Sequence, residues 1–544
     1  MVILSVITMV CCLVLGGGTR AGFLSDVALQ LCSIPLLLAS AWQIVERGVE
    51  RRTWPVLAFV AALVAVHVIQ LVPLPPAVWT GLPNRSATTT GLGLLGPLPW
   101  LPMSTTPEAT LLSLIALLPP AAILLATIGQ GYRDRRIMAL LVLAVGTVGA
   151  LLGLTQVAQG PASKLRFFEF TNATEAVGFF ANRNHFAALV YCLIVLLAAW
   201  VAESVNMTER AAKAKKLETA WILPGVACAI AFFILIAAEA MARSRAGLGL
   251  TMLALIGAVV LVMAGRQTVG GTSPTKLVIG VVVFAMLTSV QLTLYRILER
   301  FEADPLEDGR IRFAHNTVAA AKAYMPFGSG MGSFVPVYAM FERPEDLMAD
   351  TFANRAHNDV VELWLETGVA GLVLSAVFLV WLALRAVDVW RRKPDDALDV
   401  DQALARAAPL MIALLLAHSL VDYPLRTSAL LATLAFACGL LVAPPPGQQP
   451  PVSLSARQAA AKQLQRLRRS KAAAASSPSP SPAAAATGSA PFAAWPADPA
   501  APRARPVPIT PLEDMEWPEE WGGSSRKIDT KASDRSKGDE DPPT

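Results

Sequence analysis

Residues 354–363, with the sequence NRAHNDVVEL, bring together side chains that can bind anions and move protons. Histidine titrates near neutral pH and can take a proton from a hydroxyl group. Glu366, Gly368 and Gly371 follow before a long apolar run. Charged residues beside a membrane span are costly unless they are paired, solvated or used. Two interpretations are therefore open. These residues either mark the rim of a membrane span or form a functional site.

The composition of the chain is that of a membrane protein. Of its 544 residues, 54% are hydrophobic and 16% are charged, and the mean hydropathy is +0.51. A soluble chain of this length is far less apolar. The six cysteines lie inside apolar runs, so neither a disulfide framework nor a zinc site is indicated. The net charge of +5 comes from basic residues in loops and a tail, which indicates membrane topology rather than nucleic-acid binding.

Apolar windows of about 20 residues, the length that crosses a bilayer, predict an all-α, polytopic helix bundle. We expect about twelve transmembrane helices, the first of them a retained span rather than a cleaved signal. Their approximate extents are 2–18, 22–43, 54–73, 109–128, 137–158, 183–203, 220–241, 246–265, 277–297, 360–387, 405–423 and 427–443.

The distribution of basic residues between the spans predicts the orientation. The loops after every second span are rich in Lys and Arg, and cytoplasmic loops carry this excess. Residues 47–52, 133–136 and 210–216 are examples. Both termini are then cytoplasmic. The opposite face receives the Pro- and Gly-rich segment 74–108 and a long, partly helical loop at about 298–359.

The chain divides into three expected regions. Residues 1–444 form the membrane domain, and residues 445–475 are predicted to be a basic helix lying on anionic lipid headgroups. Residues 476–544 are rich in Ala, Pro and Ser and are predicted to be a disordered cytoplasmic tail. The acidic and aromatic piece at 513–521 is either an inert part of that tail or a short docking motif.

Several arginines break the charge bias because they are expected on the face opposite the cytoplasm. Arginine binds phosphate oxygens through two parallel hydrogen bonds and stays charged. Several arginines around one site can hold a lipid-linked diphosphate and stabilise it as it leaves. The residues are Arg183, Arg243, Arg245, Arg310, Arg312, Arg355 and Arg426.

Three further patterns lie on the same face. His418 and Asp422 are four residues apart on an expected helix, so the carboxylate can orient an imidazole or an arginine. Glu239 lies one helical turn before Arg243 and can pair with it. The glycines of 328–332 favour a tight turn over a nucleotide-binding loop, because no Lys-Ser/Thr follows them. No DxD motif occurs on this face, so no divalent metal is expected there.

Four motifs together resemble the O-antigen ligase and O-antigen polymerase superfamily of bacterial inner membranes. They are GFFANRNHFA at 178–187, SRAG at 244–247, the segment from Arg310 to PFGSGMGSF, and RAHNDVVELWLETGVAGL at 355–372. The resemblance covers roughly residues 140–440. Its most specific part is the HN-x-x-x-E-L run with the downstream E-x-G.

The resemblance implies an enzyme that needs no metal, nucleotide or other cofactor. Such enzymes move a glycan from undecaprenyl diphosphate to an acceptor hydroxyl at the periplasmic face, with inversion. The acceptor is lipid A-core in ligases, another glycan in polymerases, and a protein hydroxyl in related oligosaccharyltransferases. The expected partners are therefore this donor, one of these acceptors and membrane lipids, with no nucleic acid.

The resemblance also implies roles for individual residues. His357 and Asp422 are the expected catalytic residues, with His357 activating or positioning the acceptor and Asp422 supporting it. Arg183, Arg245 and Arg310 are expected to bind the diphosphate, although Arg243 fits the same turn as Arg245. The possible supporting residues are Arg243, Arg355, Asn358, His418 and Arg426.

Two other classes of membrane protein remain as alternatives. A transporter or flippase would carry charges near the membrane midplane and show repeated halves, and neither pattern is found in the sequence. A non-catalytic protein that organises polysaccharide transport or assembly would tolerate loss of His357 and the arginines. Within the superfamily, the sequence does not distinguish ligase from polymerase or from protein glycosylation.

Overall fold

The structure is a computed structural model. It describes residues 1–19, 23–213, 222–264, 279–284, 287, 305–347, 353–392 and 400–445. These residues all belong to the unit formed by residues 1–460. The predicted juxtamembrane helix and disordered tail lie almost wholly outside the described residues.

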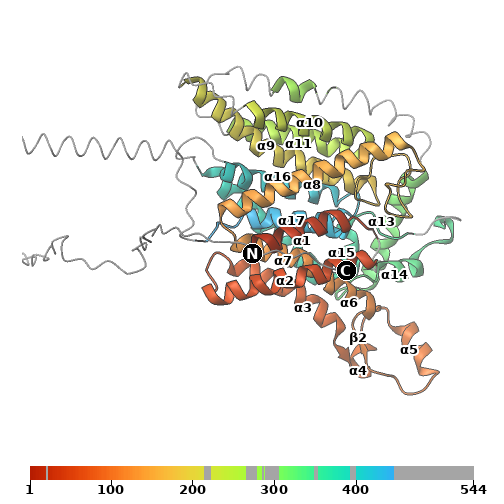
Figure 1. Ribbon diagram of the computed structural model, residues 1–544. Helices are drawn as coiled ribbons and strands as arrows, with labels where there is room; N and C mark the ends of the chain where they lie inside the picture. The colour runs from red at the N-terminus through yellow and green to blue at the C-terminus, as the bar shows by residue number, and fades with distance from the viewer. Residues whose placement is uncertain are drawn as a thin grey trace, which may run out of the picture. The chain divides into compact units, whose positions relative to one another are not determined.

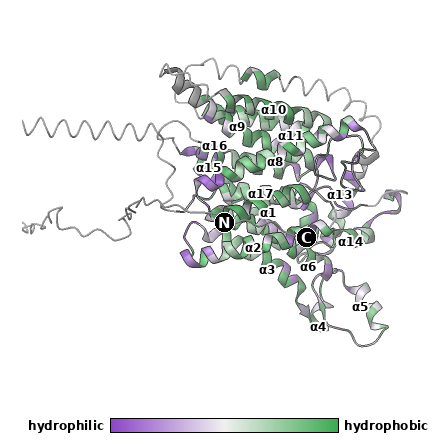
Figure 2. Ribbon diagram, viewed as in Figure 1, coloured by the Kyte–Doolittle hydropathy of each residue, from purple (hydrophilic) through white to green (hydrophobic). Residues whose placement is uncertain are grey.

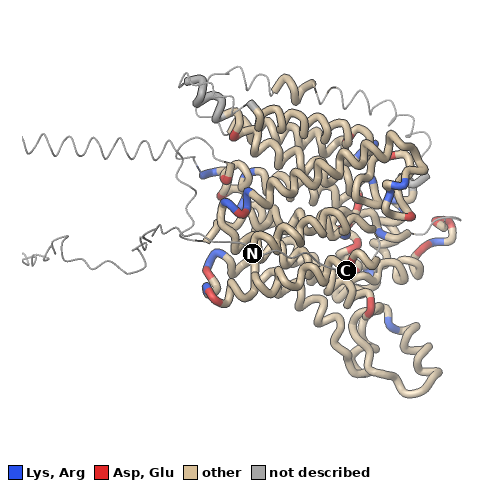
Figure 3. The backbone as a smooth tube through the Cα atoms, in the orientation of Figure 1, with Lys and Arg blue, Asp and Glu red and all other residues tan. Residues whose placement is uncertain are grey.

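The unit is a bundle of apolar α-helices (Figure 1). Hydrophobic residues cover the helices (Figure 2), and the charged residues gather mainly at their two ends (Figure 3). The helices long enough to cross a membrane are α2 Leu24–Arg47, α3 Trp54–Leu71, the pair α6 Pro107–Ile115 and α7 Leu118–Gly129, α8 Tyr132–Gln159, α9 Arg183–Lys213, α10 Ile222–Ala242, α11 Arg245–Ala264, α15 Asp359–Arg391 and α16 Val400–His418. By length and composition they make nine candidate spans within the described part of the chain.

Two of the twelve expected spans are helices shorter than the nine candidate spans. The first is α1, Val2–Leu15, and the last is α17, Ser428–Leu440. The end of α1 contacts the start of α17, where the Ala429 amide donates to the carbonyl of Gly16 at 3.1 Å. A Cβ on Gly16 would come within 2.7 Å of the Ala429 nitrogen, so glycine permits this contact. The expected span 277–297 lies mostly outside the described residues.

Each of the long helices begins and ends at one of two faces of the bundle. We call "site end" the face that holds the start of α9 and α15 and the end of α16. We call "distal end" the opposite face, which holds the end of α2, the start of α8 and the end of α17. At the distal end Arg136 pairs with Asp401, which joins the starts of α8 and α16 at 2.5 Å.

Helix α9 lies at the centre of the bundle. In the most apolar part of α9, 89% of the residues are buried, whereas only 17% are buried in α15. Helices α8, α10, α11 and α16 all contact α9. The bundle core therefore surrounds α9, and α15 exposes most of its apolar surface, as a helix at a lipid boundary would.

The loops at the site end carry most of the remaining structure. Between α3 and α6 lie β1 Pro73–Leu74, α4 Pro76–Trp79, α5 Ser86–Gly93 and β2 Leu101–Pro102. The two short strands pair antiparallel, with Pro73 opposite Pro102, and are an exception to the expected all-α class. The expected long loop contains α13 Pro305–Ala323, α14 Phe334–Phe341 and a 3₁₀ turn, η2, at Pro344–Asp346.

Candidate active site

His357 lies in the turn that leads into α15. Its φ angle is +50°, a conformation that few non-glycine residues adopt. The next residue, Asn358, caps the helix: its side-chain oxygen accepts from the amides of Val360 and Val361 at 3.0 and 3.1 Å. Asn358 also donates to the carbonyl of Leu420 at 2.8 Å. The cap and this bond fix the turn against the segment that follows α16.

His357 and Asp422 form a hydrogen-bonded pair. The Nδ1 atom of His357 lies 3.1 Å from Oδ1 of Asp422. The other carboxylate oxygen, Oδ2, accepts from the side-chain amide of Asn184 at 2.6 Å. The Asp422 side chain is buried, whereas that of His357 is 19% exposed. Two side chains thus hold the Asp422 carboxylate in place, and part of the His357 side chain remains accessible.

The charge of Asp422 is stabilised although the group is buried. Burial acts to raise the pKa of Asp422, but the hydrogen bond from His357 and nearby positive charges hold it well below its ordinary value. Arg310, on α13, is one of these charges. An ionised Asp422 accepts the Nδ1 proton of His357, which leaves the Nε2 lone pair free to take another proton.

Aromatic rings surround the imidazole of His357. Tyr423 contacts it edge to face at 5.0 Å between ring centres, and Phe313 of α13 lies 6.0 Å away in a stacked arrangement. His185 of α9 lies edge to face against Tyr423 at 4.8 Å. Burial raises the pKa of Tyr423 to about 12, so its hydroxyl stays protonated. These contacts place α9, α13 and the segment after α16 around one histidine.

His418 does not share a helical face with Asp422 as the sequence predicted. Helix α16 ends at His418, and a turn follows in which the Asp422 amide donates to the His418 carbonyl at 2.9 Å. The Nδ1 atom of His418 lies 3.1 Å from the Tyr191 hydroxyl of α9. The turn directs Asp422 toward His357, so the two histidines contact different partners.

Arg355 and Arg426 are neutralised by carboxylates at the start of α15. Arg426 Nη1 lies 2.9 Å from Glu366 Oε2. Its other nitrogens lie 3.4 Å from Glu362 and 3.5 Å from Asp359. Arg355 pairs with Glu362 at 2.8 Å. Burial acts against the charge of Arg426, but the carboxylates, Glu366 foremost, hold its pKa above the ordinary arginine value. These arginines therefore brace the His357 turn.

A kink in α15 joins this network to the long loop. Gly368 has φ +57° and ψ −138°, and a Cβ there would overlap the carbonyl of Pro326. The amide of Val369 donates to that carbonyl at 2.9 Å, and the Gly330 amide donates to the carbonyl of Glu366 at 3.0 Å. Gly328 has φ +81°. The glycine run is thus a turn that folds back onto α15.

Arg183 and Arg245 begin neighbouring helices. Arg183 is the first residue of α9 and Arg245 the first of α11. The two helices pack closely near these ends. A Cβ added to Gly247 would lie only 2.6 Å from the Cβ of Ala187, so glycine permits this close approach. Helix N-termini favour anions, so two arginines here make a positive region at the site end. Arg183 also pairs with Glu175 at 2.8 Å.

The turn between α10 and α11 holds Arg243 in a left-handed conformation, with φ +50°. Its expected pair with Glu239 does not form: no ion pair joins them in this described part of the chain. Glu239 instead lies buried against α11, where a Cβ on Gly247 would come within 2.6 Å of its Oε1. The cause is the turn at Arg243, which ends the helical spacing on which the prediction rested.

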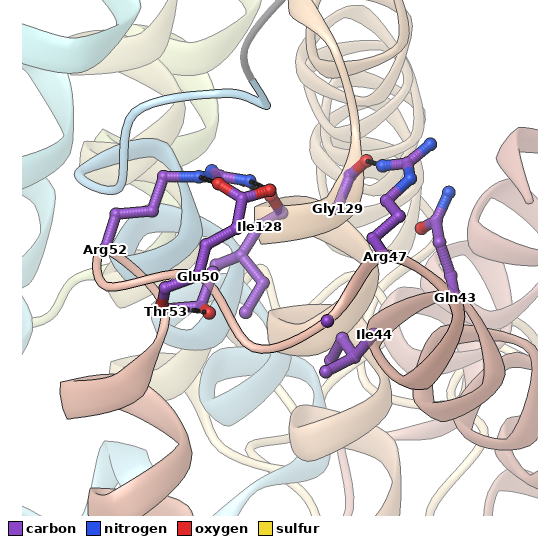
Figure 4. A pocket seen from close by; sticks show the side chains of 9 residues that line it. Gln43, Ile44, Arg47, Glu50, Arg52, Thr53, Ile128 and Gly129 are labelled. Atoms are coloured by element: carbon purple, nitrogen blue, oxygen red, sulfur yellow. Dashed lines mark hydrogen bonds and ion pairs between the residues drawn. The ribbon is translucent and has the colours of Figure 1, made fainter.

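The distal end offers a different environment. A hollow there is lined by Gln43, Ile44, Arg47, Gly48, Glu50, Arg52, Thr53, Ile128 and Gly129 (Figure 4). Arg47 donates to the Gly129 carbonyl at 3.2 Å, and Arg52 pairs with Glu50. No histidine lines this hollow. Among the described residues, no group of three His, Cys, Asp or Glu side chains is arranged to hold a metal ion.

The fold and the site define a polytopic helical membrane protein with a histidine–carboxylate pair at one face. Residues 230–376 match the O-antigen ligase family model. The predicted resemblance to the O-antigen ligase superfamily is confirmed over this segment. The match supports a glycosyltransferase-like role in polysaccharide biosynthesis. No curated protein matches the chain.

The matched segment contains His357, Arg245 and Arg310, while Arg183 and Asp422 lie outside it. Sequence reasoning missed Asn184, which holds Asp422, and the rings of His185 and Tyr423. The only available signal was their position beside predicted residues, Arg183 and Asp422. These side-chain contacts join helices that are distant in sequence, so spacing along the chain does not reveal them.

Proposed function

We propose that the protein transfers a glycan from undecaprenyl diphosphate to an acceptor hydroxyl at the site end, which faces the periplasm. The observation that carries the proposal is the His357–Asp422 pair, in which Nδ1 lies 3.1 Å from Oδ1. The pair lies at the same end of the bundle as the first residues of α9 and α11, which are both arginines. The matched ligase domain, which includes His357, supports the same class of reaction.

The chemistry follows from these positions. Asp422 holds the Nδ1 proton of His357, and Nε2 takes the proton of the acceptor hydroxyl. The hydroxyl oxygen then forms a bond to the anomeric carbon as the bond from that carbon to the diphosphate oxygen breaks. A single displacement of this kind inverts the anomeric centre.

The arginines act on the leaving group. Arg183 and Arg245 bind the diphosphate, and Arg310 on α13 adds a third positive charge near Asp422. Their guanidinium groups stabilise the charge that the diphosphate gains as it departs. Arg243 adopts a left-handed conformation in the turn before α11, and this turn positions Arg245 at the start of the helix.

We propose lipid A-core as the acceptor, because the matching model is that of the O-antigen ligases. The test compares cells that lack the gene and carry the wild type, His357→Ala or His315→Ala. His315 is an exposed histidine on α13 and serves as the matched control. The three proteins are brought to equal levels in the membrane, and gels resolve lipid-linked, core-linked and free glycan.

Loss of all core-linked glycan in His357→Ala cells, with long lipid-linked chains retained, supports a ligase. A single repeat unit left on the core assigns the same site to a polymerase, and loss of glycan from protein alone assigns it to a protein oligosaccharyltransferase. Full rescue by His357→Ala would exclude catalysis by this histidine and favour a transport or assembly role.

A further inference from the structure

The segment between α3 and α6, residues 72–106, forms a projection from the site end (Figure 1). The pairing of β1 with β2 closes its base. Within it, Trp79 is fully buried and donates from Nε1 to the carbonyl of Pro99 at 2.9 Å. The projection therefore has a small core of its own, and its exposed residues are held in place.

The projection has almost no charge. Residues 72–106 contain no Asp, Glu or Lys and a single Arg, Arg85. Arg85 is buried and donates to the carbonyl of Met103, so it gives the surface no charged group. The neighbouring segment 305–347 is of similar length and carries Glu307, Asp308, Arg310, Arg312, Lys322, Glu342, Arg343, Glu345 and Asp346. Two segments at the same end thus have opposite surface chemistry.

Large apolar side chains of the projection are exposed after α5 and just before β2. Leu94 is 84% exposed, Leu95 is 85% exposed and Trp100 is 64% exposed. Large apolar side chains exposed to this extent are unfavourable in water, and exposed apolar surface can mark an interaction site. An apolar environment must therefore cover them.

The connections of the projection indicate which environment this is. It leaves the membrane bundle at Leu71, the end of α3, and returns at Pro107, the start of α6. Both ends are therefore at the surface of the bilayer. Tryptophan is enriched at membrane interfaces, and apolar faces lie in the headgroup region. A protein partner would be expected to meet a polar, charged rim, which this segment lacks.

We propose that residues 72–106 lie in the interface of the bilayer at the site end, with Leu94, Leu95 and Trp100 inserted among the lipids. The base of the projection is tied to the glycine turn of the long loop, because the Thr105 amide donates to the Ser329 carbonyl at 2.8 Å. Insertion of the projection into the bilayer would therefore fix the distance of the glycine turn from the membrane surface. It would also fix the position of the α15 kink, on which that turn packs.

The test places a fluorescent label at the tip of the projection. Leu94→Cys is labelled with an environment-sensitive fluorophore, and the full chain is reconstituted in phosphatidylethanolamine–phosphatidylglycerol vesicles. The control is Glu345→Cys, an exposed position on η2. The unsubstituted protein, labelled in parallel, gives the background from the six native cysteines. Quenching by shallow brominated phospholipids is compared with quenching by aqueous iodide.

We expect brominated lipid to lower the emission at position 94 at least two-fold and iodide to have little effect, with the reverse at position 345. Quenching of position 94 by iodide alone would overturn the proposal. Protection from both quenchers would also overturn it and would indicate a protein partner or a second copy. Adding Leu95→Glu, at an exposed position that does not support the fold, should at least halve the lipid quenching; unchanged quenching would count against insertion.

Discussion

Arginines form ion pairs with carboxylates at both ends of the bundle, as Arg136 does with Asp401 at the distal end. Several distal arginines differ from those near His357 in that they bond carbonyls at the C-terminal ends of helices. At the distal end Arg135 donates to the carbonyls of Thr127, Gln130 and Val442 at 3.0, 3.1 and 2.7 Å. Arg385 and Arg406 also bond backbone carbonyls at helix ends. At the site end Arg183, Arg355 and Arg426 pair with carboxylates.

The difference shows what an arginine at the end of a span can do. The last carbonyls of a helix lack an intrahelical partner, so a guanidinium group there supplies hydrogen bonds that the helix cannot. A carboxylate partner neutralises the charge and can be exchanged for a substrate anion when the arginine is partly exposed. The carbonyl-bound Arg135 and Arg406 therefore stabilise helix ends, whereas we propose that the partly exposed Arg183 binds the donor.

The largest effect is expected from Arg426→Leu. This change leaves Glu366 buried without the arginine that pairs with it, and leaves Glu362 with Arg355 alone. Breaking such a network costs about 3–5 kcal/mol. We expect a large loss of folded protein, measured by thermal unfolding in detergent. The control is Arg392→Ala, which removes a more exposed pair with Asp388 at the distal end. Equal melting temperatures for the two variants would show that the buried cluster does not support the fold.

Removing a distal arginine should affect stability alone. Arg135→Met removes the side-chain donor from the carbonyls of Gln130 and Val442, while the Thr127 carbonyl keeps the Gln130 amide at 3.3 Å. Each unsatisfied buried group costs about 1–3 kcal/mol. The melting temperature should fall, while the transfer rate per folded molecule should stay within two-fold of the wild type. A loss of transfer rate greater than the loss of folded protein would mean that Arg135 also affects catalysis at the site end.

Asn184 should affect the rate but not the donor affinity. Asn184→Asp puts a second carboxylate against Oδ2 of Asp422, and we expect the transfer rate to fall about 10- to 100-fold, or about 1.4–2.8 kcal/mol. Asn184→Ala should cost less. Asn316→Ala removes a similar amide–carboxylate bond, to Asp346 at 2.8 Å, and serves as the control. A wild-type rate for Asn184→Asp would remove this residue from the site.

The smallest effect is expected from Glu175→Gln. Glu175 competes with a diphosphate for Arg183, and pairs of this kind contribute about 0.2–1 kcal/mol. We expect the KM for the lipid-linked donor to fall less than about five-fold, with kcat unchanged. A higher KM would indicate that Glu175 positions Arg183 for the donor instead of competing with it.

Much of the bundle could be predicted because hydropathy alone marks helices that cross a membrane. Most of the span limits predicted from the sequence lie within a few residues of the observed helices, such as 54–73 against Trp54–Leu71 for α3. The short α1 and α17 were overestimated mainly at their C-terminal ends, which hydropathy does not mark; after α17, Arg385 and Arg135 bond the carbonyls of Leu441 and Val442. The break between α6 and α7 lies next to Pro119 and Pro120, which the hydropathy window does not register.

The site could be predicted only in part. Side chains such as His357 and Arg245 stood out because polar residues are rare beside spans. The partner of His357 rested on the family resemblance, since spacing suggested that Asp422 faces His418 instead. The neutralisation of Arg426 could not be foreseen, because it depends on how the 3₁₀ turn η3, Pro424–Arg426, packs against the start of α15.

The central claim is that His357 accepts the acceptor proton while the arginines hold the donor. The most direct test is the steady-state transfer rate of purified His357→Ala protein in vesicles, measured against donor concentration. Loss of a general base lowers rates about 10²- to 10⁴-fold, so kcat should fall by this factor while the donor KM stays within two-fold. A kcat within two-fold of the wild type would contradict the account.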